Sequence, residues 1–432
     1  MFCIVCEVHE TSMILGADQR INTGSTSVRL GLPLAPSALA NIERHLHLNC
    51  NKWDTQIGDS SVLSAHALIL AGHEWDWLCN CAEQLAAEMT YAESIALETE
   101  RYCALAGVPA PVRRLLGTEQ NQAKPNVAVT RSMRFDFHPT STGWRVSEVN
   151  SDVPGGWTEA TELPNLYASF HPGMEIPASP LDAWTDSMRS VAAGGGVALL
   201  AAPGFLEDQQ VVLAFMRRLH GERISSTLIQ SPSALDWSSK GIRRIRGSQQ
   251  RVSAVVRFYQ IEWLCNLSNN SGWRNLLQTA ELAITNPTIS VLSESKRFPL
   301  VINDISRCTA WKTLMPECRD PRDVDTSDWD GWALKAAYSN TGDEVYLCGD
   351  MDRAERQQLI LKVRRNPTKW IAQRRFDTIP LYSDEGLLYP CIGVFVVDGR
   401  AAGAYVRLSK RQVTDGSSKE APLFIDRTDF AK

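Results

Sequence analysis

The sequence lacks the long hydrophobic segments that mark membrane-spanning or exported chains. Its longest apolar run, residues 191–202, contains three consecutive glycines and is too short to cross a bilayer. The N-terminal stretch MFCIVCEVHE contains neither a basic region nor a long apolar segment, so a signal peptide is not expected. We therefore expect a cytoplasmic protein with no membrane partner.

An excess of positive charge is also missing. The formal net charge is -5, and no basic cluster interleaved with aromatic residues is present, which argues against nucleic-acid binding. The 11 cysteines are odd in number and scattered, which favours reduced thiols over a disulfide framework. Cys3 and Cys6 form a CxxC pair, but Cys79 and Cys81 are one residue too close to complete a zinc site. Core packing is therefore favoured over structural zinc.

Several catalytic and cofactor signatures are absent as well. The 8 histidines show no metal-ligand spacing, and there is no Ser-His-Asp or Cys-His signature, internal repeat or low-complexity block. The glycine run at 194–196 precedes a strand-like segment, and the later PGFLED turn has one glycine, so a dinucleotide fingerprint is excluded. A content of 44% hydrophobic and 22% charged residues is typical of a globular protein.

What the chain does have is a dense group of polar side chains in RSMRFDFHPTSTGWRVSEVNSDVPGGW, residues 131–157. Alternation predicts two half-buried strands, with Arg134 and Asp136 on one face of the first. Glu148 and Asn150 share a face of the second. If Arg134 pairs opposite Asn150, then Asp136 lies opposite Glu148. Two opposed carboxylates cost about 0.2–1 kcal/mol unless positive charge lies between them, and a divalent cation would supply it.

Two carboxylates and an amide oxygen form an all-oxygen set, which suits Mg2+ better than zinc. Mg2+ usually completes its coordination with substrate phosphates, and Arg134 would be placed to hold a phosphate. On this interpretation, Asp136→Asn or Glu148→Gln should abolish turnover and leave the fold intact. The alternative, a polar hairpin face that simply contacts water, stays open.

Helical and strand-like patterns flank this segment. Apolar spacing predicts a helix at residues 36–48 and a long amphipathic helix at residues 74–105. The second has a stripe that indicates core packing, formed by Leu78, Ala82, Leu85, Met89, Ala92 and Ala96. A βαβ-like unit is predicted from strands and a helix at residues 197–202, 206–219, 224–229 and 254–257.

Two lysines lie in strand-like surroundings further along. Lys296 follows residues 282–292, which are strand-like around an Asn-Pro turn. Lys335 lies between two alanines on one face of WALKAAY, and a buried ammonium group requires a partner. The small polar loop at 339–343 after it could close over phosphates. An edge-strand lysine facing water is the alternative.

Near the C-terminus, two apolar strands flank Asp398-Gly399, a dipeptide that strongly indicates a two-residue hairpin turn. The second of these strands carries Arg407.

The order of these segments resembles the glutathionylspermidine synthetase-like family. The matching motifs are RFDF, ExNxDxP at 148–154, VVRFYQIEW, ITNPTISVLSESKR, WALKAAYSNTG and WIAQ, within residues 74–409. The resemblance implies an α+β or α/β architecture, namely a circularly permuted ATP-grasp fold with an inserted Rossmann-like (pre-ATP-grasp) segment and an N-terminal helical region. The divisions expected are residues 1–125 (N-terminal region), 126–190 (first ATP-grasp part with the hairpin), 191–290 (Rossmann-like segment) and 291–432 (nucleotide-binding part).

The same resemblance implies site residues and ligands. Asp136, Glu148 and Asn150 would coordinate Mg2+, and Arg134 would contact the transferred phosphoryl group. The implied ATP-binding residues are Lys296, Lys335, Ser339, Asn340, Thr341, Gly342, Gln373 and Arg407. The implied substrate contacts are Asp152, Glu207 and Asp208. The loop SNTGD after Lys335 departs from the family in having a single glycine.

Together these features predict an ATP-dependent carboxylate-amine ligase that forms an acyl phosphate from a small carboxylate, with ATP and Mg2+ as cofactors. Small molecules are the only partners expected, and the pattern identifies neither the substrates nor the oligomeric state. Two other functions stay open: a non-catalytic ATP-binding protein of the same fold, and a Mg2+-dependent phosphotransferase.

Overall fold

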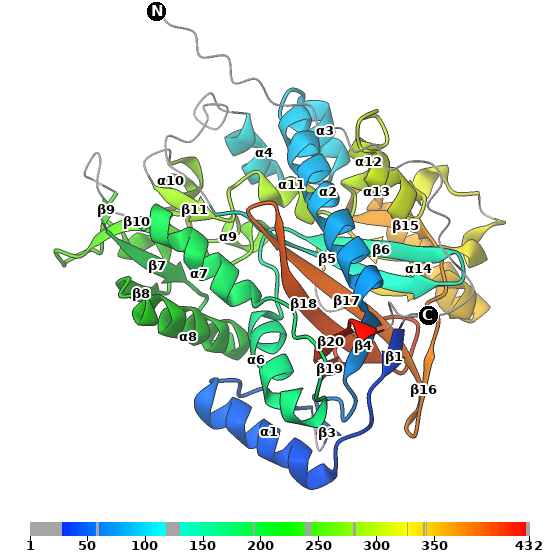
Figure 1. Cartoon of the computed structure of the whole chain (residues 1–432). Coiled ribbons are helices and arrows are strands. Elements are labelled where there is room, and N and C mark those ends of the chain that lie inside the picture. Colours follow the sequence, from blue (N-terminus) through cyan, green and yellow to red (C-terminus); the bar gives the residue numbers. More distant parts are fainter. Residues whose placement is uncertain are drawn as a thin grey trace, which may run out of the picture.

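The computed structural model describes residues 28–57, 60–117, 130–192, 195–237, 243–279, 282–325, 327–339, 342 and 344–428, apart from the side chains of residues 206 and 207. One large antiparallel sheet has the strand order β19-β18-β17-β5-β6, with β16 added to β17. Its strands are β5 Ser132–Thr140, β6 Gly143–Asn150, β16 Leu381–Ser383, β17 Gly386–Val397, β18 Arg400–Ser409 and β19 Lys419–Ala421. Figure 1 shows β17 and β18 beside β5 and β6, although the two hairpins are far apart in the sequence.

Both predicted hairpins are part of this sheet. β5 and β6 pair as far as Thr140 and Gly143, and β17 and β18 turn at Asp398-Gly399. The φ angles of 48° at Asp398 and 79° at Gly399 are those of a two-residue hairpin turn, which confirms that prediction. Phe135 and Phe137 of β5 share a hydrophobic core with the long helix α2, so the residues between them face the other side of the sheet.

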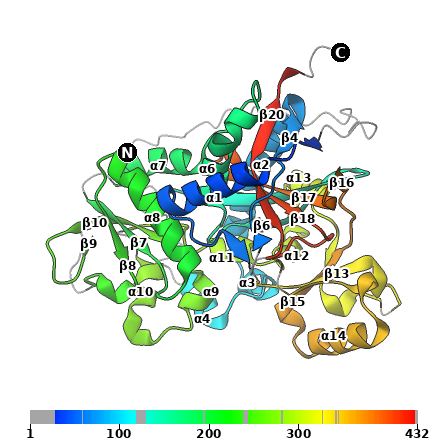
Figure 2. The same ribbon diagram turned by 90° about the horizontal axis from the view of Figure 1, so that it is seen from below.

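Two smaller sheets lie on opposite sides of the large sheet (Figure 2). One is parallel in the order β11-β10-β7-β8, with β9 antiparallel on β10, and the other is antiparallel in the order β12-β15-β13-β14. The first contains β7 Gly196–Leu200, β8 Ser226–Ile229, β9 Arg243–Arg244, β10 Arg251–Arg257 and β11 Ala283–Thr285. The second contains β12 Cys318–Arg319, β13 Trp332–Ala336, β14 Val345–Leu347 and β15 Trp370–Arg374.

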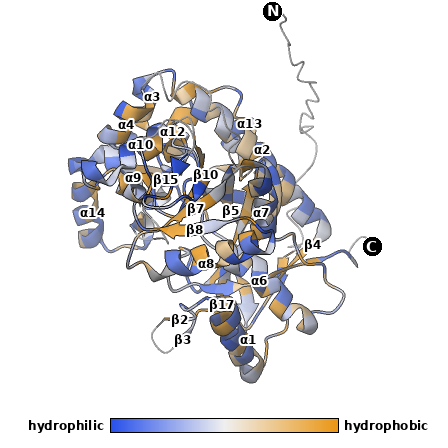
Figure 3. Cartoon of the chain, turned by 90° about the vertical axis from the view of Figure 1, so that its left-hand side faces the viewer, coloured by the Kyte–Doolittle hydropathy of each residue, from blue (hydrophilic) through white to orange (hydrophobic). Residues whose placement is uncertain are grey.

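The parallel sheet confirms the strands and helix of the predicted βαβ unit. Strand β7, GVALL, is buried throughout, as expected for a parallel strand covered on both faces. Figure 3 shows the hydrophobic character of this strand inside a layer of helices with mixed surfaces. Helix α8, Leu206–Gly221, connects β7 to β8.

The remaining strands form a three-stranded sheet in the order β1-β4-β20 and a short pair β2-β3. Their bounds are β1 Val28–Leu30, β2 Gln56–Ile57, β3 Ser60–Ser61, β4 Leu68–Ala71 and β20 Leu423–Asp426. The other helices are α1 Pro36–Asn49, α2 Gly72–Ala96, α3 Glu100–Leu105, α4 Ala110–Leu116, α6 Trp157–Tyr167, α7 Pro180–Val191, α9 Ile261–Leu264, α10 Trp273–Gln278, α11 Ser290–Glu294, α12 Pro299–Ile302, α13 Thr309–Leu314 and α14 Arg353–Arg365. Helix α1 confirms the helix predicted at 36–48.

Two predicted elements differ from the structure. The helix predicted at 74–105 is interrupted, because Thr99 leaves helical geometry and its side chain caps α3 by accepting from the Tyr102 N–H. The stripe on α2 is nevertheless buried core, as predicted. Residues 282–292 form a strand only as far as Thr285. After Pro287 the chain turns into helix α11, with the Ser290 N–H donating to the Pro287 carbonyl at 2.9 Å.

Within the described ranges, no helix is both long and apolar enough to cross a membrane. The cysteines described there are free thiols, and all but Cys79 are buried, in line with the core role predicted for them. Cys3 and Cys6 lie outside the described residues.

Gly393 of β17 has no side chain, and this leaves room on the large sheet for the side chains of Arg134 and Asp136. It pairs opposite Asp136, and a Cβ there would lie 2.7 Å from Arg134 Nε and 2.8 Å from Asp136 Oδ1. We expect Gly393→Ala to lower the free energy of unfolding by about 1–3 kcal/mol through overpacking, measured by urea denaturation. Gly221→Ala, where an added Cβ meets nothing within 4 Å, is the control and should change stability little. Equal stability of the two variants would contradict this account.

Candidate functional site

The predicted hairpin forms with the predicted pairing. Arg134 lies opposite Asn150 and Asp136 lies opposite Glu148. A register shift between Asp136 and Phe137 leaves Ser147 as an extra residue, which is a β-bulge. The Ser147 carbonyl accepts hydrogen bonds from Lys335 Nζ at 3.2 Å and Gln373 Nε2 at 3.1 Å. The bulge therefore joins the large sheet to the β12–β15 sheet.

Positive charge at Asp136 comes from two arginines. Arg134 donates to its carboxylate through Nε to Oδ1 at 2.8 Å and through Nη2 to Oδ2 at 3.0 Å. Arg407, from β18, donates to Oδ2 through Nη2 at 2.9 Å. The side chain of Asp136 is 1% exposed. The charge conflict inferred from the sequence is thus relieved in part by the protein itself, and not by a cation alone.

Glu148 is balanced by a different set of charges. Lys296 Nζ lies 3.2 Å from its Oε2 and also donates to the Ser339 carbonyl at 2.7 Å. Burial alone would raise the pKa of Glu148, but Lys296, Lys335 and Arg407 together lower it to about 2. Glu148 is therefore an anion across the physiological pH range, and its side chain is 19% exposed.

Lys335 is buried in β13, between β15 and β14, which overturns the alternative of an edge lysine facing water. Burial lowers its pKa, while the Glu148 carboxylate acts in the opposite direction. The strand reading of WALKAAY and the hairpin into β14 are confirmed.

The residues predicted to bind Mg2+ fit a hard cation by type. Glu148 and Asn150 line the same cavity, and the Asn150 amide Nδ2 is buried without a hydrogen-bond partner. Asp136 adds a carboxylate whose lone pairs are partly used by the two arginines. No group of three or more His, Cys, Asp or Glu side chains suited to a metal occurs in the described residues, so a cation here depends on the amide.

Two cavities meet at the hairpin. A narrow one, about 70 Å³, lies between the large sheet and the β12–β15 sheet and is lined by His138, Glu148, Lys335, Gly342, Gln373 and Arg407, among others. A wide one, about 460 Å³, lies towards the parallel sheet and is lined by Arg134, Glu148, Asn150, Asp208, Tyr405 and Arg407, among others. Glu148 and Arg407 contribute to both, so they mark the junction.

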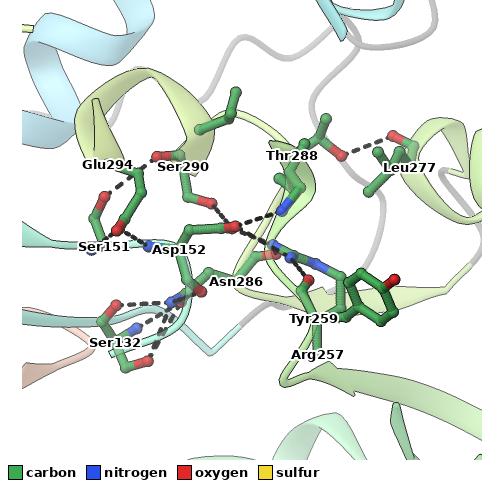
Figure 4. A network of polar contacts seen from close by, with 12 residues as sticks. Ser132, Ser151, Asp152, Arg257, Tyr259, Leu277, Asn286, Thr288, Ser290 and Glu294 are labelled. Carbon is green, nitrogen blue, oxygen red and sulfur yellow. Dashed lines mark hydrogen bonds and ion pairs between the residues drawn. The ribbon is translucent and has the colours of Figure 1, made fainter. Parts of the chain in front are cut away.

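Asp152 lies behind the hairpin, away from both of these cavities. Its side chain is 0% exposed and accepts hydrogen bonds from the Arg257 guanidinium, the Ile261 N–H and the Ser290 hydroxyl (Figure 4). Glu294 accepts from the Ser151 and Asp152 N–H groups at 2.7 and 2.8 Å. This network fixes the chain directly after Asn150. The contact with substrate predicted for Asp152 is not supported, because its oxygens are occupied and buried.

Other predicted residues have mixed positions. Ser339 has a buried hydroxyl without a partner, and Gly342 lines the narrow cavity with φ of 73°. Asn340 and Thr341, as well as the side chain of Glu207, lie outside the described residues. Asp208 lines the wide cavity.

A charged cluster around Lys52, of which Asp54 and Glu420 line the wide cavity, was not predicted from the sequence. Lys52 is 1% exposed and contacts Glu159 at 2.5 Å, Asp54 at 3.1 Å and Glu420 at 3.1 Å. Tyr405 donates to Glu420 Oε1 at 3.2 Å. No local pattern marks Lys52.

Tyr405 itself could have been found from its strand. It lies two residues before Arg407, hence on the same face of β18. Its ring lies 5.3 Å from the guanidinium of Arg134 and 5.6 Å from that of Arg407. The ring therefore connects the arginine pair to the Lys52 cluster.

Comparisons with known proteins bear on this arrangement. The family model described as "Glutathionylspermidine synthase preATP-grasp" matches residues 50–426, which confirms the resemblance drawn from the ordered motifs. The structure of a glutathione synthetase-like effector from Globodera pallida shares the fold, with a TM-score of 0.60 and 11% identity, covering 91% of this chain and 98% of that chain. A protein assigned as a gamma-glutamylcysteine synthetase from Methylobacillus flagellatus reaches a TM-score of only 0.34 at 11% identity, covering 76% and 86%. No curated protein sequence matches.

Asp136 is a counter-ion of two buried arginines, so its replacement should affect stability as well as activity. This differs from the expectation that Asp136→Asn leaves the fold intact. We expect this substitution to lower the free energy of unfolding by about 3–5 kcal/mol, as for a broken buried ion pair, measured by urea denaturation. Asp377→Asn, at a side chain that is 68% exposed, should change it by less than about 0.5 kcal/mol. An unchanged midpoint for Asp136→Asn would rule out the counter-ion role.

His138 should make stability depend on pH. Burial lowers its pKa from 6.5 to about 4, so between these values the unfolded chain binds more protons and stability falls as the pH decreases. From this group we expect a loss of about 3 kcal/mol by pH 4, measured by denaturation at a series of pH values. His138→Gln should flatten the profile between pH 6.5 and pH 4. A profile that keeps its slope in the variant would show that other groups cause it.

Proposed function

The chain belongs to the glutathionylspermidine synthase pre-ATP-grasp family, and from this premise we propose that it is an ATP-dependent ligase joining a small carboxylate to an amine. The family is one of synthetases, which supports carbon-nitrogen ligation. The observation that carries the proposal is the junction of the two cavities at Glu148 and Arg407. A nucleotide in the narrow cavity would direct its terminal phosphate at substrates in the wide one.

In the proposed reaction, the substrate carboxylate attacks the γ-phosphorus of ATP, and ADP leaves. The amine then attacks the carbonyl carbon of the acyl phosphate, phosphate leaves, and the nitrogen loses a proton to give the amide. In this proposal Arg134 and Arg407 would face the charge that develops on the transferred phosphoryl oxygens, and their hydrogen bonds to Asp136 would hold both guanidinium groups in place before substrate binds. No protein nucleophile is required.

We propose that Asp136, Glu148 and Asn150 hold Mg2+ in this site. The anionic, partly exposed carboxylate of Glu148 supports this assignment, and Asn150, which lines the same cavity, would contribute its amide oxygen. When bound, Mg2+ would neutralise phosphate charge during transfer. Lys296 lies 3.2 Å from Glu148 Oε2 and would add a second positive charge beside the phosphates.

The proposed ATP-binding residues are Lys296, Lys335, Ser339, Asn340, Thr341, Gly342, Gln373 and Arg407. Of these, Lys335, Gly342, Gln373 and Arg407 line the narrow cavity. The volume of about 70 Å³ is well below the roughly 300–1,000 Å³ of small-molecule pockets. Nucleotide binding would therefore require the β12–β15 sheet to move away from β6, which breaks the hydrogen bonds of Lys335 and Gln373 to Ser147 and frees both side chains for the ligand.

The same proposal covers the architecture. The large sheet and the β12–β15 sheet would be the two parts of a circularly permuted ATP-grasp fold, and the parallel sheet its Rossmann-like insertion. The proposed divisions remain residues 1–125, 126–190, 191–290 and 291–432. Asp208, which lines the wide cavity, and Glu207 are the proposed amine contacts.

The test is ADP release with a panel of carboxylates and amines, followed by the product mass. A ligase product has lost water relative to its reactants, whereas a phosphotransferase product has gained phosphate. Absence of ADP release with every pair, together with retained Mg-ATP binding, would favour a non-catalytic ATP-binding protein instead.

Lys335→Ala should weaken Mg-ATP binding by about tenfold or more, since a charge-assisted hydrogen bond contributes about 1.5–3 kcal/mol. Calorimetric titration measures this. Lys362→Ala, at a side chain that is 54% exposed and is not part of the lining of either cavity, is the matched control and should bind normally. Equal affinity of the Lys335 variant and the wild type would remove this lysine from the nucleotide site.

A further inference from the structure

The outer wall of the wide cavity is formed by apolar side chains that are unusually exposed. Ile57 is 55% exposed, Phe205 49% and Trp263 38%, and all three line this cavity. They come from three separate segments, namely β2, the loop before α8, and α9. The rings of Phe205 and Trp263 lie 5.7 Å apart at 38°. We refer to these three residues as the apolar rim.

Single exposed apolar residues are common on protein surfaces, but several that converge on one cavity indicate a binding site. The apolar rim continues inward, because Phe258 and Trp157 also line the cavity and are 4% and 3% exposed. Between rim and interior lies Gln260, whose Oε1 is buried without a hydrogen-bond partner. An apolar wall with one unpartnered polar atom thus runs from solvent towards Arg134.

Acidic residues also line the cavity. Asp54 and Glu420 are two of the three carboxylates that contact Lys52, and the third is Glu159. One lysine leaves this group with an excess of negative charge. Asp208 lines the cavity as well, and Asp415 is paired with Arg411. The lining therefore suits a ligand that carries positive charge.

Position along the cavity sets the direction of a ligand. Tyr405 lies between Glu420 and the two arginines. Its hydroxyl donates to Glu420, and its ring contacts the guanidinium groups of Arg134 and Arg407. An ammonium group beside Glu420 would stand next to the proposed acyl phosphate, so Glu420 is proposed as an amine contact in addition to Asp208. The rest of the molecule would then extend along Phe258 to the apolar rim.

We propose that the amine substrate carries an ammonium group attached to an aromatic or alkyl group, and that Phe205 and Trp263 bind this apolar part. This inference rests on the proposed ligase function. It makes Phe205 and Trp263 specificity-determining residues for the acceptor, because their exposed rings give an apolar group contacts that the charged nitrogens of a polyamine do not make.

The test is calorimetric titration of the full chain with phenethylamine, ethylamine and spermidine. We expect phenethylamine to bind more tightly than either of the others. In a Phe205→Ala, Trp263→Ala double variant its affinity should fall by at least about tenfold, since the loss of even one methylene contact in an apolar pocket changes discrimination by about that factor. Trp263→Phe should retain most of the affinity.

Tyr382→Ala is the matched control, because Tyr382 is 85% exposed and belongs to neither cavity. It should leave phenethylamine binding unchanged, and all variants should bind Mg-ATP like the wild type. Tighter binding of spermidine than of phenethylamine, or equal phenethylamine affinity in the double variant and the wild type, would overturn the proposal.

The titration and the ADP assay separate the two proposals. ADP release only with polyamines would retain the ligase and reject the apolar acceptor. Rim-dependent phenethylamine binding without ADP release from any substrate pair would retain the binding site and reject the ligase.

Discussion

The structure depends on how the charge of Asp136 is neutralised inside the large sheet. Its carboxylate lies among three strands and accepts hydrogen bonds from Arg134 on its own strand and from Arg407 two strands away. Gly393, on the strand between them, provides the space for these side chains. A carboxylate that is 1% exposed is tolerated only with such partners. The pairing therefore holds the arginines in fixed positions on one face of the sheet.

From this arrangement the two cavities follow. On this face of the sheet, the guanidinium groups of Arg134 and Arg407 are bound to Asp136, and Glu148 remains an anion. The bulge at Ser147 turns a backbone carbonyl towards the smaller antiparallel sheet. The site is thus built from side chains that position charge, and it contains no group that must form a covalent bond. That matches the chemistry of phosphoryl and acyl transfer, in which placement and electrostatics supply most of the catalysis.

Features set by local pattern could be predicted from the sequence. The pairing of Asp136 with Glu148 follows from strand alternation, the Asp398-Gly399 turn follows from its dipeptide, and helix α1 follows from its apolar spacing. The break between α2 and α3 was not predicted, because the apolar helical spacing continues past Thr99, the residue that caps α3.

The surroundings of the site could not be predicted in the same way. That Arg407 reaches Asp136, that Asp152 is buried under Arg257, and that Lys52 lies among three carboxylates are consequences of contacts between distant segments. The hydrophobic periodicity of a sequence does not show which strands will be neighbours in a sheet. The resemblance to a family suggested the roles proposed for Arg407 and the two lysines, whereas the partners of Asp152 became visible only in three dimensions.

The order of the large sheet also has a consequence for synthesis on the ribosome. β5 pairs directly with β17, so the hairpin of residues 132–150 cannot complete its sheet until residues 386–397 have been made. Such non-local pairing slows folding, since the chain loses the entropy of loop closure before the stabilising contacts form. During translation, Asp136 of β5 would lack its partner Arg407 until β18 has been made, and the apolar face of β5 would be only partly covered. The nascent chain would therefore present an unpaired strand edge for most of its elongation, a state in which chaperone binding competes with aggregation.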